Sequence, residues 1–233
     1  MVVLSALNAL GKRLTVEVAG EVTASPWYSD VKVVAPLTGR EPDQVHTRDF
    51  TVSPRGNHDY YMAEELRARP FARLASGGGE FIFCASDDPR RQGLAMWRGQ
   101  HHEISTYAPA PWARDDKYGL AWFEGLSFTD EPDGLVVHSE RDTVVVDSLD
   151  ISIAEVGYLY VHGAQSGLGF VPEHAGALLG VGELWKQLAD DLALDHLIFA
   201  SSTAVAVGSP ADLDDPHRMV DLFGRVTTLE YEV

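Results

Sequence analysis

Short runs in which apolar and polar residues alternate recur along most of this chain, and they limit its fold more than any other feature. In residues 13–22, RLTVEVAGEV, every second position is apolar over the first half of the run. A period of two is the side-chain period of a strand with one buried face. The sequence therefore predicts a strand at 13–22. It predicts further short strands at 30–35 and 47–52, joined by a loop at 36–44 that holds two prolines and a glycine.

The middle of the chain continues this pattern. Residues 118–139, YGLAWFEGLSFTDEPDGLVVHS, place DEPDG between two runs rich in apolar residues. Proline favours the start of a turn and glycine accepts a positive φ, so this segment predicts a hairpin. Strand-like runs at 76–86, 93–107 and 142–148 extend the expectation to an antiparallel sheet.

Three segments instead favour helices. Residues 60–75 contain good helix formers after Asn57 and Asp59, either of which can cap the first turn, and Pro70 should end or kink this helix. Residues 173–194 place five large apolar residues on one helical stripe, namely Leu178, Leu184, Trp185, Leu188 and Leu192. A third helix is expected from Pro216, with Asp215 as its cap and Gly224 just past its end.

These elements together predict an α+β fold, with a predominantly antiparallel sheet and about three or four helices. The segment 173–233 is expected to run α-β-β-α-β, because a hairpin at 196–209 and a strand at 225–233 flank the last helix. No internal repeat or low-complexity linker divides the chain. The organisation is therefore either one domain over 1–233 or two packed lobes, a β-rich lobe at 1–165 and a second lobe at 173–233.

The charge of the chain is concentrated in its second half. The whole chain has a formal net charge of −17, with −1 in residues 1–120 and −16 in residues 121–233. Such a field repels nucleic acid and anionic membranes, and it attracts a basic protein or a near-neutral face of another copy. We therefore expect a protein partner, basic or self-associating, in a homo-oligomer or larger complex.

The compartment is predicted from absent signals and from cysteine usage. No apolar run approaches the roughly 20 residues that cross a bilayer, and the basic residues of the first segment follow its apolar stretch. A single cysteine, Cys84, excludes an internal disulfide and is expected to be a buried strand residue. These features predict a cytoplasmic protein.

The tetrapeptide Gly56-Asn57-His58-Asp59 is the first candidate for catalytic chemistry. It resembles one block of the calcineurin-like metallophosphoesterases, in which the Asn and His help to hold two metal ions. That family also has an Asp-x-His block at the end of its first strand and a Gly-Asp-x-x-Asp block before the Asn-His, and neither block precedes the tetrapeptide in this chain. We therefore expect His58 and Asp59 to lie in a turn that enters a helix, with metal binding as the alternative.

The second candidate is RGQHHEIS, residues 98–105. On a strand, His101 and Glu103 share one face, which permits metal binding or acid–base catalysis. A transition metal needs three or four ligands, so others such as His138 or His162 are required. A cross-strand polar face is the competing interpretation.

Other motifs fall short of known sites. Ser166 lies in GAQSGLG, which is one residue too long for a nucleophile elbow, and the glycine-rich segments lack the remaining residues of nucleotide-binding loops. The acidic run 212–216 is expected at a helix start instead of around a cation. No cofactor and no resident metal are predicted.

An aromatic, proline-rich segment gives the strongest prediction of an interface. Residues 108–123 contain two prolines and two tryptophans, a composition typical of rigid contact surfaces. The candidate contact residues are Trp112, Arg114, Tyr118 and Trp122. The alternative places these aromatics in the core.

These patterns favour a non-catalytic subunit that binds protein, either a component of a virion, tail-like or other multi-subunit particle or an acidic inhibitor of a basic partner. The alternative is a metal-dependent hydrolase that uses His58 and Asp59 or His101 and Glu103.

Overall fold

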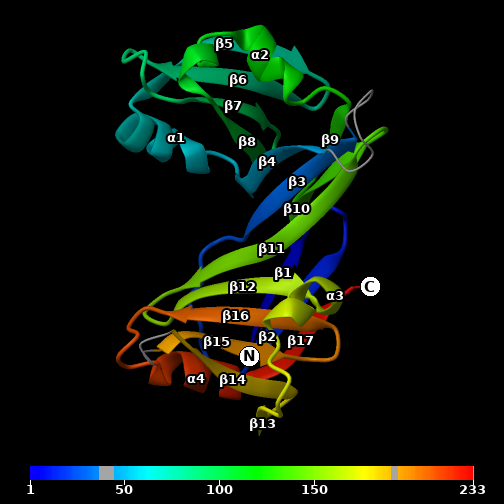
Figure 1. Cartoon of the computed structure of the whole chain (residues 1–233), viewed down its shortest axis with the longest axis vertical. Helices are drawn as coiled ribbons and strands as arrows, with labels where there is room; N and C mark the ends of the chain where they lie inside the picture. Colours follow the sequence, from blue (N-terminus) through cyan, green and yellow to red (C-terminus); the bar gives the residue numbers. More distant parts are fainter. Residues whose placement is uncertain (37–44, 190–193, 233) are drawn as a thin grey trace. The chain divides into compact units, whose positions relative to one another are not determined.

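The computed structural model describes residues 1–36, 45–189 and 194–232. Within them the chain has the α+β fold that the sequence predicts, with mostly antiparallel sheets (Figure 1). Two compact units form: unit 1 contains residues 1–8, 12–28 and 147–233, and unit 2 contains residues 9–11 and 29–146. The main part of unit 2, residues 29–146, is inserted in the sequence of unit 1, so its boundaries lie near residues 28 and 147. The sequence suggested a single lobe boundary at 165–172. Apart from Pro36, the predicted loop at 36–44 lies outside the described residues.

Unit 1 has two antiparallel sheets. The first has the order β1-β2-β17, and its strands are Val2–Leu7, Arg13–Val18 and Val226–Tyr231. The second has the order β13-β14-β15-β16-β12-β11, and its strands are Ala177–Leu179, Gly182–Leu188, Leu194–Ala200, Ala204–Pro210, Gly157–Gly163 and the end of Thr143–Ile153. The short helices α3 (Ala164–Gly167) and η3 (Leu168–Phe170) follow β12.

The core of unit 1 lies between these sheets. The alternating apolar residues of β2 pack in one cluster with Leu149, Phe199 and residues of α4 (His217–Gly224). The rings of Phe199 and Phe223 stack with centroids 5.1 Å apart. Alternation in the sequence thus corresponds to one buried face per strand.

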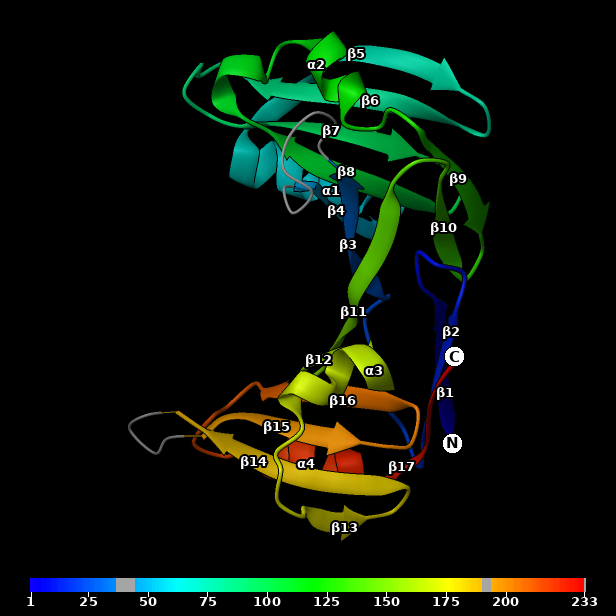
Figure 2. The same cartoon turned by 45° about the vertical axis from the view of Figure 1, so that its right-hand side comes forward.

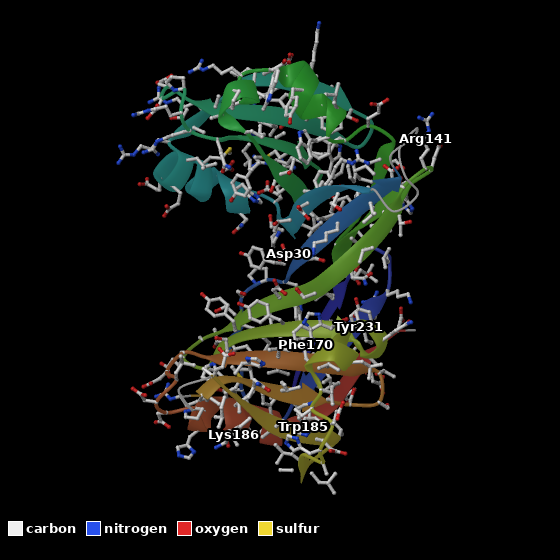
Figure 3. The ribbon with its side chains drawn as sticks, in the orientation of Figure 1. Asp30, Arg141, Phe170, Trp185, Lys186 and Tyr231 are labelled. Atoms are coloured by element: carbon white, nitrogen blue, oxygen red, sulfur yellow. The ribbon has the colours of Figure 1, made fainter. Side chains whose placement is uncertain are left out.

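The helix predicted at 173–194 is wrong, because residues 177–188 of this segment form the hairpin β13–β14. Gly180 has a φ of +57° and allows a tight turn, and a Cβ on Gly182 would meet the carbonyl oxygen of Ala200 at 2.3 Å. Neighbouring residues of β14 point to opposite faces: Trp185 is buried and Lys186 is exposed (Figure 3). The apparent helical stripe therefore belongs to two strands, and Leu192 lies outside the described residues.

The last predicted helix is confirmed as α4, with a start shifted by one residue. Pro216 occupies the cap position and the helix runs from His217 to Gly224. The Asp215 carboxylate accepts a hydrogen bond from the backbone N–H of His217 at 3.4 Å, so it still serves the first turn.

Unit 2 is built on a six-stranded antiparallel sheet of order β3-β4-β8-β7-β6-β5. Its strands are Tyr28–Pro36, Val45–Pro54, His102–Ala108, Gly93–Arg98, Gly79–Ser86 and Ala68–Ser76. The predicted hairpin is present as β9 (Leu126–Glu131) and β10 (Gly134–Ser139). The helical elements are α1 (Asn57–Tyr61), η1 (Met62–Leu66), η2 (Ala110–Trp112) and α2 (Asp116–Ala121).

Both faces of this sheet are covered, which explains why every residue of β7 is buried. On one face Met62 and Leu66 of η1 pack on Cys84 and Met96. On the other face Phe83 and Trp97 pack in a cluster with Phe123 and the β9–β10 hairpin. The helices α1 and α2 accordingly lie on opposite sides of the sheet (Figure 2). A strand buried on both faces reads as a continuous apolar run instead of an alternating one.

The helix predicted at 60–75 is only partly correct. Helical structure spans 57–66, and Arg67, with a φ of +48°, leads into the strand β5 at Ala68. Pro70 lies inside this edge strand, a position that proline tolerates because the missing N–H costs no ladder hydrogen bond at an edge. None of the helices in the described ranges is long and apolar enough to span a bilayer.

Candidate functional site

Two groups of residues in unit 2 stand out, and both include residues that the sequence singled out. The first, called the polar cluster here, lies between α1 and the sheet and consists of Ser53, His58, Asp59, Arg98, Glu103 and Ser105. The second, called the α2 aromatic surface, consists of Trp112, Tyr118 and Trp122.

Strand register brings the polar cluster together. Glu103 of β8 lies directly opposite Arg98 on β7 and Ser53 on β4. Ser105 is two residues further along β8, and therefore on the same face as Glu103. Three strands thus present one polar row to the helix above them.

The carboxylate of Glu103 holds the start of α1. It accepts hydrogen bonds from the backbone N–H of Gly56 at 3.0 Å and of His58 at 2.8 Å. Helix α1 begins at Asn57 with Gly56 in the cap position, so the prediction that Asn57 or Asp59 caps a helix near Tyr60 is wrong. A carboxylate from a distant strand performs the function of a local cap.

The guanidinium of Arg98 balances the charge of Glu103. Its Nε lies 2.7 Å from Glu103 Oε2, and its Nη2 lies 2.8 Å from Asp59 Oδ1. Burial raises the pKa of Glu103, but hydrogen bonds from His58 and Gly56 and the charge of Arg98 outweigh it and lower that pKa to about 2. Glu103 is fully buried and ionised, a state that proteins maintain by pairing and hydrogen bonding.

His58 joins this carboxylate to a serine. Its Nδ1 lies 2.8 Å from Glu103 Oε1 and its Nε2 lies 2.8 Å from the hydroxyl of Ser105. An ionised carboxylate can only accept, so Nδ1 of His58 carries a proton and donates to Glu103. In that tautomer of the uncharged ring, Nε2 accepts a hydrogen bond from the Ser105 hydroxyl. The hydroxyl of Ser53 lies a further 3.2 Å from Nδ1.

The order Ser105, His58, Glu103 is that of the charge-stabilised triads of serine hydrolases. In those enzymes the serine is exposed to substrate beside free N–H groups that stabilise an oxyanion. Here Ser105 is 3% exposed, and the N–H groups of Gly56 and His58 already bind Glu103. In this conformation the hydrogen bonds of Glu103 and Ser105 to His58 and Gly56 hold α1 against the sheet.

The structure regroups the candidate pairs of the sequence. Glu103 contacts His58 instead of His101, whose backbone N–H donates to Asp130 at 2.7 Å. Asp59 pairs with Arg98, and its side chain is 59% exposed. Within residues 1–36, 45–189 and 194–232, no group of three or more His, Cys, Asp or Glu side chains is placed to hold a metal ion.

The remaining polar candidates lie elsewhere. His138 contacts the hydroxyl of Thr129 at 3.0 Å on the β9–β10 hairpin. His162 belongs to unit 1, where it stacks on Phe170 with centroids 4.7 Å apart. The Ser166 hydroxyl of α3 donates to the carbonyl of Gly163, which precedes that helix, and Asp212 accepts from the N–H of Asp214 in a turn before α4.

Cys84 is a fully buried residue of β6, as expected. Burial raises the pKa of its thiol to about 12, against smaller opposing effects of Arg73 and Arg98. The thiol is therefore a packing group and not a nucleophile at neutral pH.

The α2 aromatic surface gathers three of the four predicted interface residues. Trp112 and Tyr118 stack with centroids 5.2 Å apart and planes 15° apart, and Tyr118 meets Trp122 edge to face at 6.3 Å. Trp112 is 48% exposed. Arg114, the fourth residue, donates to the carbonyl of Ser86 and to Asp87.

Local sequence explains how α2 presents these rings. The Asp115 carboxylate accepts from the N–H groups of Lys117 and Tyr118, which caps the helix. Gly119 is buried against the sheet, where a Cβ would lie 2.6 Å from the ring of Phe83. The close approach at Gly119 fixes the helix and leaves the Tyr118 side chain partly exposed.

Two adjacent hollows border the α2 aromatic surface. The smaller, of about 160 Å³, is lined by Arg48, Tyr118, Ala121 and Trp122. The larger, of about 390 Å³, shares Arg48 and Ala121 with it and is completed by Glu124, Gly125, Glu140, Arg141 and Asp142. Arg48 is buried, donates to the carbonyls of Trp122 and Glu124, and forms an ion pair with Asp142.

The sequence interpretation missed Arg98, Ser53, Ser105 and Arg48. The only signal was a charged residue at the end of an otherwise apolar run, as in GLAMWR for Arg98. A buried charged residue needs a partner of opposite charge. Which residue is that partner depends on the strand register, which the local sequence does not give.

Comparison with protein-family models, with curated proteins and with solved structures finds no match for this chain.

Proposed function

We propose that this chain is a non-catalytic protein-binding or assembly subunit that makes its principal contact through the α2 aromatic surface. It acts as one component of a multi-subunit particle, such as a virion or tail-like assembly, or as an acidic inhibitor of a basic partner. The observation that carries this proposal is the stacked pair formed by the exposed Trp112 and the partly exposed Tyr118.

Interface energetics support the choice of these residues. Trp and Tyr are enriched among the residues that dominate binding energy, because large rigid rings lose little conformational entropy on contact. Trp112 and Tyr118 are already ordered by their stacking, and Asp115 fixes the first turn of α2. A preordered aromatic surface binds with a small entropic cost.

The charge supports a basic partner or a more basic face of another copy. Unit 1 has 5 Lys and Arg against 16 Asp and Glu, and unit 2 has 13 against 19. Both units are therefore acidic. Such a field accelerates encounters with a basic protein and weakens as salt increases.

Size and capture measurements test this function. Light scattering of the full chain over a range of concentrations should show self-association, or tagged protein should retain one partner, identified by mass spectrometry, from a lysate of the native host. Trp112→Ser should abolish the association, whereas Tyr158→Ser, at a residue of unit 1 that is 55% exposed, should preserve it. A strict monomer that retains no Trp112-dependent partner contradicts the proposal.

Hydrolysis is the second candidate function, and the Ser105–His58–Glu103 arrangement is the observation that favours it. A fluorophosphonate probe followed by peptide mass spectrometry tests it, because the probe labels only an activated and accessible serine. Labelling of Ser105 that is lost in His58→Ala supports a hydrolase. A metal-dependent hydrolase would instead contain stoichiometric Zn, Mn or Fe when the protein is purified without chelator, and the metal would be lost in His101→Ala.

A further inference from the structure

The smaller hollow beside α2 has the features of a pocket for one compact apolar ring. Its volume is about 160 Å³, and Tyr118 and Trp122 both line it. Their rings contact each other edge to face, with centroids 6.3 Å apart and planes at 70°. The carbonyl of Trp122 accepts from Arg48 at 2.6 Å, so the backbone of this wall is fixed. Aromatic walls of this kind bind proline in an extended polyproline II segment.

The larger hollow next to it is acidic at its surface. The charges of Arg48 and Asp142 cancel in their ion pair. Glu124 and Glu140 are exposed and outnumber Arg141, whose side chain extends from the turn between β10 and β11 (Figure 3). The remaining charge favours a cationic side chain in this hollow.

We propose that the α2 aromatic surface and the acidic hollow together bind an extended, proline-containing segment of another protein that carries an arginine or lysine. A proline ring occupies the smaller hollow lined by Arg48, Tyr118, Ala121 and Trp122, and the basic side chain lies near Glu124 and Glu140. This inference rests on the proposed protein-binding function and adds the chemical class of the partner.

Two physical properties favour this occupant. A polyproline II segment is extended before it binds, so it loses little backbone entropy, and it leaves its backbone groups to solvent. The two hollows share Arg48 and Ala121, so one short extended segment can reach both. The net acidity of unit 2 adds a long-range attraction for a basic segment.

Fluorescence titration of the full chain tests the proposal. The probe is a synthetic ten-residue peptide in which proline pairs alternate with arginine. Two matched peptides serve as controls: one replaces each arginine with glutamate, and the other replaces each proline with glycine or serine. We expect saturable binding of the proline–arginine peptide, about tenfold or more weaker binding of each control, and weakening at high salt.

Variants locate the site. Tyr118→Ala should weaken binding of the proline–arginine peptide about tenfold or more. The double charge reversal Glu124→Lys and Glu140→Lys changes exposed residues only and should shift preference towards the glutamate peptide. Tyr158→Ala in unit 1 is the control and should bind as the unmodified chain does. Circular dichroism of each variant confirms that it is folded.

Three outcomes overturn the proposal. They are no binding of the proline–arginine peptide at millimolar concentration, equal binding of all three peptides, or unchanged peptide affinity in both Tyr118→Ala and the double charge reversal. If the peptide fails but Trp112→Ser still abolishes self-association or partner capture, the occupant is a folded protein surface or a second copy. In that case the partner class is wrong and the protein-binding function stands. If neither assay depends on α2, both proposals are wrong.

Discussion

Arg98 and Glu103 face each other directly across β7 and β8, with Arg98 Nε 2.7 Å from Glu103 Oε2. Both side chains are buried, and the carboxylate also accepts from two N–H groups at the start of α1. One ion pair therefore connects two strands and a helix. The hydrogen bonds of Arg98 and of the two N–H groups all depend on the Glu103 carboxylate. Loss of this side chain therefore leaves several polar groups unpaired.

Glu103→Gln should destabilise the protein by about 3 to 5 kcal/mol, because it leaves the buried guanidinium of Arg98 without its closest carboxylate. Urea unfolding at pH 7 measures this change. Glu131→Gln, at an exposed residue of β9, is the matched control and should lie within about 0.5 kcal/mol of the unmodified chain. A loss under about 1 kcal/mol for Glu103→Gln would show that Asp59 alone can balance Arg98.

The same carboxylate should make stability depend on pH in acid. The pKa of Glu103 is lowered to about 2 from an ordinary 4.5, so the unfolded state binds the proton first as pH falls. The stabilisation is complete above about pH 5 and is lost as pH falls through about 2, by on the order of 3 kcal/mol. Urea unfolding at pH 7, 5 and 3 should show the first part of this loss in the unmodified chain, about 2 kcal/mol by pH 3. Glu103→Gln should show a smaller decrease over the same range, and parallel curves would contradict the assignment.

Cys84 should be unreactive in the folded protein. Its thiol is fully buried and its pKa is raised to about 12, so the thiolate fraction at pH 8 is very small. Ellman's reagent should react with one thiol per chain in 8 M urea and with almost none in native buffer over the same time. Rapid reaction in native buffer would mean that the β6 region opens frequently.

The sequence correctly predicted those strands and turns that are specified by a pattern of only a few neighbouring residues. The alternation at β2 and the DEPDG turn between β9 and β10 each specify their own geometry. The helix prediction for residues 173–194 failed because apolar residues of a hairpin matched a helical stripe by coincidence. Gly180 and Gly182 were the residues that indicated a turn instead.

The polar cluster could not be predicted in the same way. His58 and Glu103 are 45 residues apart, and their contact depends on the register of β4 with β8. No local pattern fixes that register, so the sequence suggested two separate pairs, His58 with Asp59 and His101 with Glu103. The proximity of Trp112, Tyr118 and Trp122 was easier to predict, because they lie within one short segment, and their role as an interface stays a prediction.

Gly157 and Gly125 both have a positive φ, and Gly157 should tolerate substitution by alanine less well than Gly125. Its φ is +136°, and a Cβ would lie 2.1 Å from the carbonyl oxygen of Ser209 on the neighbouring strand β16. Gly157→Ala therefore combines backbone strain with a clash inside the sheet and should cost about 3 kcal/mol or more. Gly125 has a φ of +77° but open space around its Cβ position, so Gly125→Ala should cost only about 1 to 2 kcal/mol. Urea unfolding of the two variants side by side measures the difference. Equal costs would mean that β12 and β16 separate enough to admit a methyl group, which would contradict the close backbone approach at this position.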